Sequence, residues 1–264
     1  MLPVLLACAV SPIAVGCGGE ESVKNAVDPV AQAATKTAAA GTVELALSGE
    51  VSAAGNAIPI DATGVFDLEH KRGLLQATTS VPGKGEVKID ELLDGLVLYM
   101  RSDALVPSLG GKHWIKLDLE ALGRKQGFDL GQLQQLGGGT DPTQWLTYLK
   151  KAGRVEKVGS EDIQGMPTTH YRATINLDKV ADSAGDAASS VRRLEQITGT
   201  KTLPTDVWVD DHGRIRRQAI DYSIKQPTPM RMQFTIDYKR FGVPVDVNKP
   251  DTDDTIDLAD LIGG

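Results

Sequence analysis

A two-residue apolar period recurs along most of this chain and restricts the possible folds more than any other feature. Between Met230 and Tyr238, five apolar side chains alternate strictly with four polar or charged ones. Successive side chains of a β-strand point to opposite faces, so this pattern is typical of a strand with one buried face and one face in water. Val43, Leu45 and Leu47 show the same period. The chain is therefore expected to fold around a sheet.

Other apolar stretches, bounded by turn residues, predict further strands. They cover residues 43–48, 58–60, 65–68, 74–79, 87–89, 96–100, 114–117, 155–163, 166–175, 207–209, 214–224 and 230–238. Hairpin turns are predicted at Gln164-Gly165 and at Asp210-Asp211-His212-Gly213, which are rich in residues that tolerate a positive φ. The pattern indicates one α+β domain built on a large antiparallel sheet.

Helical spacing is confined to three intervals. Residues 23–40 are predicted to form an amphipathic helix that ends at Gly41, where a left-handed cap belongs. Residues 119–151 and 177–198 form the other two intervals, and Trp145 and Leu149 share one helix face in the first of these. A curved sheet with an apolar concave face could take these helices as a lid.

Residues 1–16 have the features of an export signal. No residue before Glu20 is charged, and most are apolar. A 16-residue helix would reach only about 24 Å, less than the roughly 30 Å hydrocarbon core of a bilayer. Ala14-Val15-Gly16-Cys17 resembles a bacterial lipobox, although Leu is usual where Ala14 stands. We therefore predict lipid attachment at Cys17, and the alternative is an ordinary cleaved secretory signal.

These features predict the organisation of the whole chain. A lipoprotein signal peptide covers residues 1–16, a tether 17–25, a single folded domain 26–250 and an acidic flexible tail 251–264. Both cysteines fall within the first seventeen residues, so no disulfide is expected in the body of the protein. The expected location is the extracytoplasmic face of the cell membrane, where the protein is held by its lipid anchor.

Composition and motifs restrict the function. The sequence has 28 Lys and Arg against 35 Asp and Glu, a net charge of −7, so nucleic acid is not an expected partner. It contains no nucleophile elbow, phosphate loop, dinucleotide fingerprint or zinc-protease motif. The four histidines have no second His or Cys at ligand spacing, and Asp251-x-Asp253 lacks the rest of a calcium loop. No catalytic residue, metal or cofactor is therefore predicted.

Four segments carry a family resemblance: GTVELALSG (41–49), WIKLD (114–118), VGSEDIQGMPTTHY (158–171) and LPTDVWVDDHGRI (203–215). They are similar to the LppX/LprAFG group of actinobacterial lipoproteins, which is related in fold to LolA-type carriers. The resemblance extends from about residue 23 to 246. It implies a large curved antiparallel sheet, an open half-barrel of about ten or eleven strands, with helices covering its concave face.

The resemblance also implies that an apolar cavity holds the acyl chains of lipids or glycolipids moving between envelope layers. Alternation within the strands then selects the residues expected to line the ligand pocket. They are Val43, Leu45, Leu47, Ile58, Ile60, Leu96, Leu98, Met230, Met232 and Phe234, with Trp145 and Leu149 on the lid. A one-residue slip in register would reverse this assignment.

We therefore predict a non-enzymatic carrier. Its partners are a lipid or glycolipid ligand, the membrane through the N-terminal anchor, and an envelope transporter. The rival hypothesis is an anchored interaction or sensory module with a packed core and no ligand, because inward apolar faces are the default of antiparallel domains. An enzyme would need two carboxylates that converge in a cleft.

Overall fold

The computed structural model describes residues 21–53, 55–81, 85–125, 153–183, 185, 188–225, 229–258 and 260. Four α-helices lie in these ranges: α1 (Glu21–Ala38), α2 (Leu119–Lys125), α5 (Leu177–Ser183) and α6 (Ala188–Thr198). The strands are β1 (Thr42–Ala53), β2 (Asn56–Asp67), β3 (Arg72–Val81), β4 (Gly85–Asp94), β5 (Val97–Arg101), β6 (Trp114–Asp118), β7 (Gly153–Ile163), β8 (Met166–Asn176), β9 (Thr202–Asp210), β10 (Ile215–Ile224), β11 (Met230–Phe241) and β12 (Thr255–Asp257). Two short 3₁₀ turns cover Val106–Ser108 and Thr252–Asp254.

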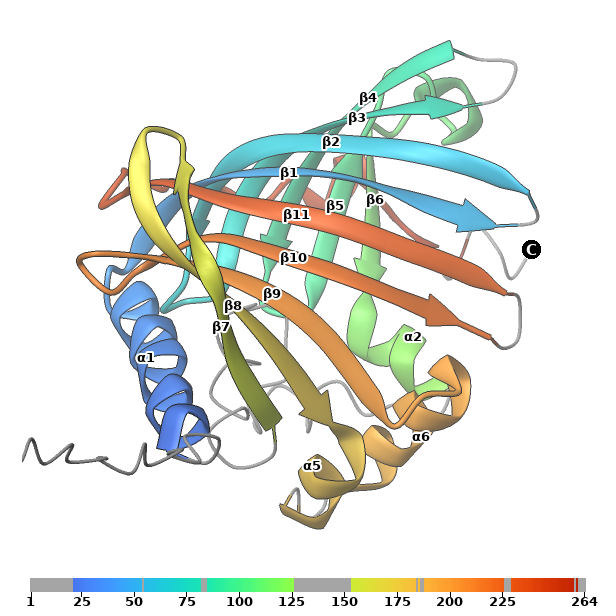
Figure 1. Cartoon of the computed structure of the whole chain (residues 1–264). Coiled ribbons are helices and arrows are strands. Elements are labelled where there is room, and N and C mark those ends of the chain that lie inside the picture. The colour runs from blue at the N-terminus through green and yellow to red at the C-terminus, as the bar shows by residue number, and fades with distance from the viewer. Residues whose placement is uncertain are drawn as a thin grey trace, which may run out of the picture.

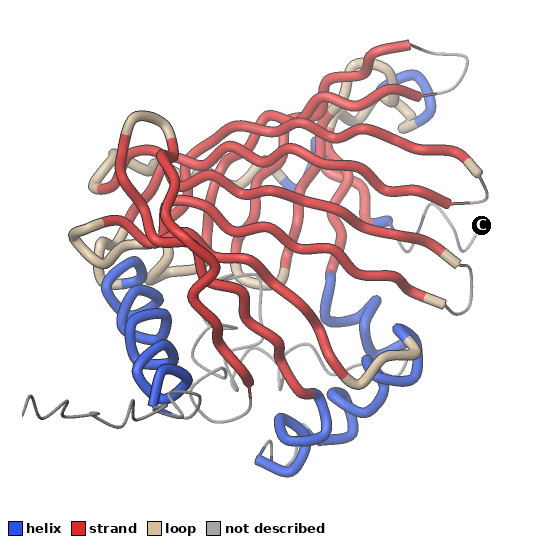
Figure 2. Tube along the Cα trace, viewed as in Figure 1, coloured by secondary structure: helices blue, strands red, loops and turns tan. Residues whose placement is uncertain are grey.

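All the described strands belong to one open sheet (Figures 1 and 2). Their order is β12-β6-β5-β4-β3-β2-β1-β11-β10-β9-β8-β7. Every neighbouring pair is antiparallel except β12 with β6. The strands from β1 to β6 form a meander, and β11 joins the second meander, β7 to β11, to β1. The predicted large antiparallel sheet is confirmed, with twelve strands in the described ranges where about ten or eleven were expected.

The sheet has two chemically different faces. Directly opposed residues of antiparallel strands point to the same side, so the register assigns each side chain to a face. Val43 opposes Phe66, and Leu45 opposes Tyr238. We call the face that carries these four residues the inner face, and the opposite side the outer face.

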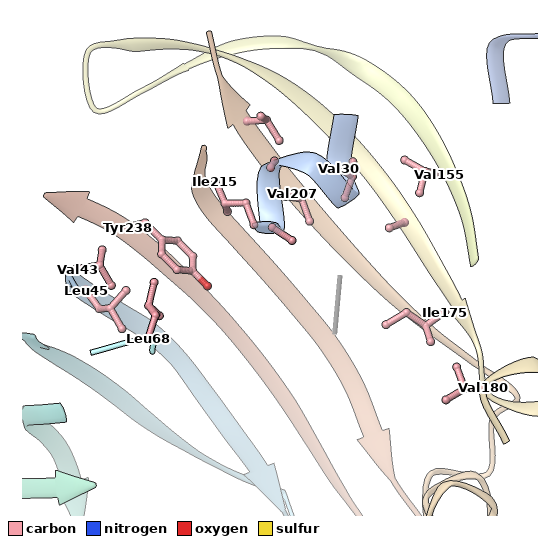
Figure 3. Close-up of a cluster of buried hydrophobic side chains, with 14 of the residues drawn as sticks. Val30, Val43, Leu45, Leu68, Val155, Ile175, Val180, Val207, Ile215 and Tyr238 are labelled. Atoms are coloured by element: carbon pink, nitrogen blue, oxygen red, sulfur yellow. The ribbon is translucent and has the colours of Figure 1, made fainter. Parts of the chain in front are cut away.

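Helix α1 packs on the inner face and supplies part of the core (Figure 3). Val30 and Ala33 are completely buried, and Ala34 is 2% exposed. Their small side chains let the helix backbone approach β7, β9 and β10 closely. The helix is followed by Gly41 at φ 75°, which turns the chain into β1 as predicted. Helices α5 and α6 pack against each other and contact β8 and β10 respectively.

The predicted turns are confirmed. Gln164 and Gly165 join β7 to β8 with φ values of 56° and 79°, the left-handed conformation at both central residues that a tight hairpin needs. The segment between Asp210 and Ile215 joins β9 to β10. Asp210 Oδ1 accepts a hydrogen bond from the backbone N–H of Arg214 and so closes this turn.

The C-terminal residues differ from the predicted flexible tail. Thr252–Asp254 form a 3₁₀ turn and Thr255–Asp257 add strand β12 to β6. The physical reason is the polar edge of the sheet: Lys112 Nζ donates to the carbonyl of Asp253 at 2.8 Å, and the His113 ring hydrogen-bonds Asp254 at 2.6 Å. The carboxylate of Asp254 and the backbone carbonyl of Asp253 are thus held by His113 and Lys112, just before β6.

The helix boundaries also differ from those predicted. Helix α1 begins at Glu21, so it includes part of the predicted tether 17–25. The predicted helical interval 177–198 divides into α5 and α6. In the interval 119–151 the described part is α2, and residues 126–151 lie outside the described residues.

Candidate functional site

The register brings most of the predicted pocket residues onto the inner face. Leu47, Gly49 and Val51 lie on the inner face of β1. Gly49 opposes Ile60 of β2 and Phe234 of β11, and Val51 opposes Ile58 of β2 and Met232 of β11, so these four partners lie on the inner face too. Leu98 joins the same face through its pairing with Leu93. Leu96 lies in the turn between β4 and β5. Trp145 and Leu149 lie outside the described residues, as does Cys17.

The inner face divides into a packed part and an open part. Val43, Leu45 and Tyr238 lie in the same buried cluster as Val30 of α1, at 0%, 9% and 0% exposure. Val43 and Leu45 therefore keep little surface for a ligand, although both were predicted to line the pocket. Farther along the same strands the side chains keep accessible surface, and Ile58 is 36% exposed.

We call the open part of β1, β2, β10 and β11 the open apolar patch. Its residues share the inner face and are half-buried, apart from the exposed Ile58. They are Leu47, Ile58, Ile60, Ile220, Tyr222, Ile224, Met230, Met232 and Phe234. The three residues of β10 were not among the predicted pocket residues. Their alternation, Ile220-x-Tyr222-x-Ile224, is the signal that could have found them. Burial raises the pKa of the Tyr222 hydroxyl above its usual value.

The inner face continues onto β3, β4 and β5 as a second surface, which we call the β3–β5 wall. Its members are Leu75, Ile89, Glu91, Leu93, Leu98 and Met100, all half-buried. Glu91 is the one acidic residue among them. Burial raises the pKa of its carboxyl group.

A pocket of about 680 Å³ lies on the outer face, away from the helices. Small side chains such as Ser48, Ala219 and Thr235 leave this space above the strands, and carboxylates stand at its margin. Two of these carboxylates are already paired: Asp221 accepts two hydrogen bonds from Arg231, and Asp206 accepts from Arg172 and the His170 ring. This open pocket, with three carboxylates in its lining, suits a hydrocarbon chain poorly.

Each histidine has a carboxylate neighbour. His170 lies on the outer face, where its ring stacks on Trp208 with centroids 4.2 Å apart. His70 pairs with Asp67, His113 with Asp254 and His212 with Asp211. Among the described residues, one cluster offers three ligand atoms within 4.8 Å, namely Asp210, Asp211 and His212. Both oxygens of Asp210 already accept hydrogen bonds, so the cluster is explained as turn structure.

None of the helices in the described ranges combines the length and the apolar character needed to cross a membrane.

No family model matches the sequence. An uncharacterized 31.2 kDa protein of Streptomyces griseus, from the rplA–rplJ intergenic region, is 27% identical over 205 residues, 76% of this chain and 66% of that protein. A predicted lipoprotein of Streptomyces coelicolor is 28% identical over 208 residues, 76% of this chain and 61% of that protein. The matches thus span less than two thirds of the length of these relatives.

Solved structures decide the fold. The crystal structure of the lipoprotein LppX of Mycobacterium tuberculosis aligns over 85% of this chain and 98% of LppX, with a TM-score of 0.50 and 17% identity. The chain has the fold of LppX. The LppX-like resemblance of the four sequence segments is therefore confirmed at the level of fold. LprF of Mycobacterium bovis aligns over 86% of this chain and 97% of LprF, with a TM-score of 0.46 and 14% identity.

Proposed function

We propose that this protein is a lipid-anchored, non-enzymatic carrier that binds acyl chains of lipids or glycolipids against the inner face and moves them across the cell envelope. The observation that carries the proposal is the open apolar patch. In a sheet built around an ordinary core, the inner face would be buried throughout, as Val43 and Tyr238 are. Here the same face keeps accessible apolar surface from Leu47 to Ile58.

The chemistry of the open apolar patch fits an acyl chain. Burying each methylene group contributes about 0.8 kcal/mol, so a chain that buries about ten of them gains on the order of 8 kcal/mol before the cost of association. Met230 and Met232 project onto the patch beside each other across the register from Val51 and Ala53. Thioether side chains repack readily, which suits ligands of varied length and shape.

The LppX fold and the lipoprotein name of the Streptomyces coelicolor relative support the anchor and the extracytoplasmic location. Two acyl chains at Cys17 would hold the protein at a membrane without a spanning helix. Cys17→Ala should move the protein from the membrane fraction to the soluble fraction. Unchanged membrane retention of this variant contradicts the anchor and leaves the binding proposal in place.

Native mass spectrometry after detergent-free purification tests ligand binding. The wild-type chain should carry extra mass that corresponds to lipid. Met232→Trp, on the inner face, should lower the lipid-bound fraction about tenfold, because a large ring occupies space that the acyl chain needs. Gln233→Trp is the matched control, since Gln233 is the next residue of β11 and lines the outer pocket. It should leave the lipid-bound fraction unchanged.

The outer pocket favours the rival function, an anchored interaction module. A ligand-free mass, with a melting temperature that added lipid does not raise, supports the module and contradicts the carrier. Loss of a bound partner in Gln233→Trp but not in Met232→Trp points the same way.

A further inference from the structure

Glu91 is an unusual residue for its position. It lies in the middle of the β3–β5 wall, where it opposes Leu75 of β3 and Met100 of β5. Ile89 and Leu93 flank it on the same face of β4. Among the register-paired inner positions of β2 to β6, which run from Ile60 in β2 to Leu117 in β6, no other side chain is ionisable. One carboxyl group thus interrupts a continuous apolar wall.

The carboxyl group of Glu91 has no partner among the described residues. No hydrogen bond or ion pair joins it to another side chain or backbone group there. The charged neighbours on its own strand, Lys88 and Asp90, point to the outer face, where Asp90 pairs with Arg101 at 2.8 Å. The raised pKa of Glu91 accordingly has desolvation as its only cause. Nothing in the described protein compensates for the loss of water around this group.

An uncompensated polar group on an apolar wall destabilises the fold. Partial burial removes some of the water around the ionised carboxyl group and no protein hydrogen bond replaces it among the described residues, whereas leucine or methionine at this position would complete the wall. Sites that cost stability in this way are typical of functional positions. The side chain is half-buried rather than sealed, so a molecule lying along the inner face can reach it.

We propose that Glu91 hydrogen-bonds a hydroxyl group of the bound lipid, and that it selects neutral, hydroxyl-bearing lipids over anionic ones. This inference rests on the proposed carrier function. A hydroxyl group suits both forms of the carboxyl group, because it donates to the carboxylate and accepts from the carboxylic acid. A carboxylate or phosphate headgroup beside ionised Glu91 places two like charges in a poorly solvated space, which is unfavourable.

The two surfaces of the inner face then have different tasks. The open apolar patch on β1, β2, β10 and β11 takes hydrocarbon, and Glu91 on the β3–β5 wall takes the polar group of the same ligand. Pockets of this kind bind mainly through apolar contact and obtain specificity from a few polar groups. The specificity-determining residue is therefore one that an apolar pattern search passes over.

The test compares two probes with the same acyl chain, 1-monooleoylglycerol and oleate, which differ in headgroup charge. Their affinities for the full-length, delipidated protein are measured at neutral pH by displacement of a fluorescent acyl probe. The wild type should bind monooleoylglycerol about tenfold more tightly than oleate. Glu91→Gln keeps a hydrogen-bonding group and removes the charge, so it should bind oleate about tenfold more tightly than the wild type does. Glu91→Leu should lose about tenfold in affinity for monooleoylglycerol.

Glu86→Gln is the matched control, because Glu86 is exposed on the outer face of the same strand. It should change neither affinity. The melting temperatures of Glu91→Gln and Glu91→Leu should equal or exceed that of the wild type, which excludes misfolding as the cause of any loss. Equal affinities for the two probes that neither Glu91 variant alters overturn the role of Glu91 and leave the carrier function standing. Failure of the wild type to bind either probe overturns both.

Discussion

Replacing Asp210 with alanine should destabilise the protein far more than its position in a hairpin turn suggests. Its side chain is only 1% exposed, and Oδ2 accepts a hydrogen bond from Arg216 Nε at 2.6 Å. Arg216 is itself 10% exposed, donates to the carbonyl of Lys239 and stacks over Phe241 at 5.0 Å. The pair joins the β9–β10 turn to β11.

The magnitude follows from what Asp210→Ala leaves behind. Arg216 would remain buried without its counter-charge, and breaking a buried pair in this way costs about 3 to 5 kcal/mol. For a protein of this size the melting temperature should fall by about 6 to 20 °C. Urea unfolding followed by circular dichroism measures the change in the free energy of unfolding.

Two further variants test the reasoning. Asp211→Ala removes the neighbouring carboxylate, which is 76% exposed and pairs with His212, so the change should stay within about 1 kcal/mol. Adding Arg216→Met to Asp210→Ala removes the uncompensated charge and should restore part of the lost stability. A loss below about 1 kcal/mol for Asp210→Ala, or no recovery in the double variant, refutes the argument from buried charge.

Two other predictions concern strand packing and the C-terminal strand. Gly73→Ala should lower the free energy of unfolding by about 1 to 3 kcal/mol, since the new Cβ would lie 2.4 Å from Phe66 Cδ2. Gly159→Ala is the control and should be close to neutral, because no atom lies within 4 Å of its Cβ position. Equal urea midpoints for the two variants would contradict the packing argument. The hydrogen bond from His113 lowers the pKa of Asp254. The ionised carboxylate therefore stabilises the β12 segment at pH values above the ordinary carboxyl pKa, and this stabilisation is lost as the pH falls through the lowered pKa of Asp254. In His113→Ala, an NMR titration of the carboxyl carbon should give Asp254 a higher pKa than in the wild type. The same pKa in both proteins would mean that a group other than His113 lowers it.

Much of the candidate site could be predicted because alternation depends only on local backbone geometry. A two-residue period assigns Met230, Met232 and Phe234 to one face before any partner strand is known. The register then places Ile58 and Ile60 on the same face as Met230, Met232 and Phe234. The sequence indicated this only through the similar alternation within β2. The residues predicted on different strands therefore share one face whenever their own strand alternates.

The division of that face into a packed and an open part could not be predicted. Val43 and Leu47 are both aliphatic and lie on the same face of β1. Val43 is completely buried in the core cluster that includes Val30 and Ala33 of α1, whereas Leu47 lies outside that cluster and is half-buried. The acidic segment after residue 250 likewise resembles a solvated tail, and it became a strand because His113 and Lys112 stand beside it in space.

The sequence alone determined the large antiparallel sheet, the hairpin turns, the helix ahead of β1 and the face to which each alternating residue belongs, because these depend on neighbours within a few positions of the chain. Tertiary structure decided which part of the inner face is covered, that Asp210 is buried against Arg216, and that Glu91 lies among apolar side chains with no partner in the part of the chain that the structure describes. These properties depend on segments distant in sequence, whose relative placement is fixed only when the strands assemble.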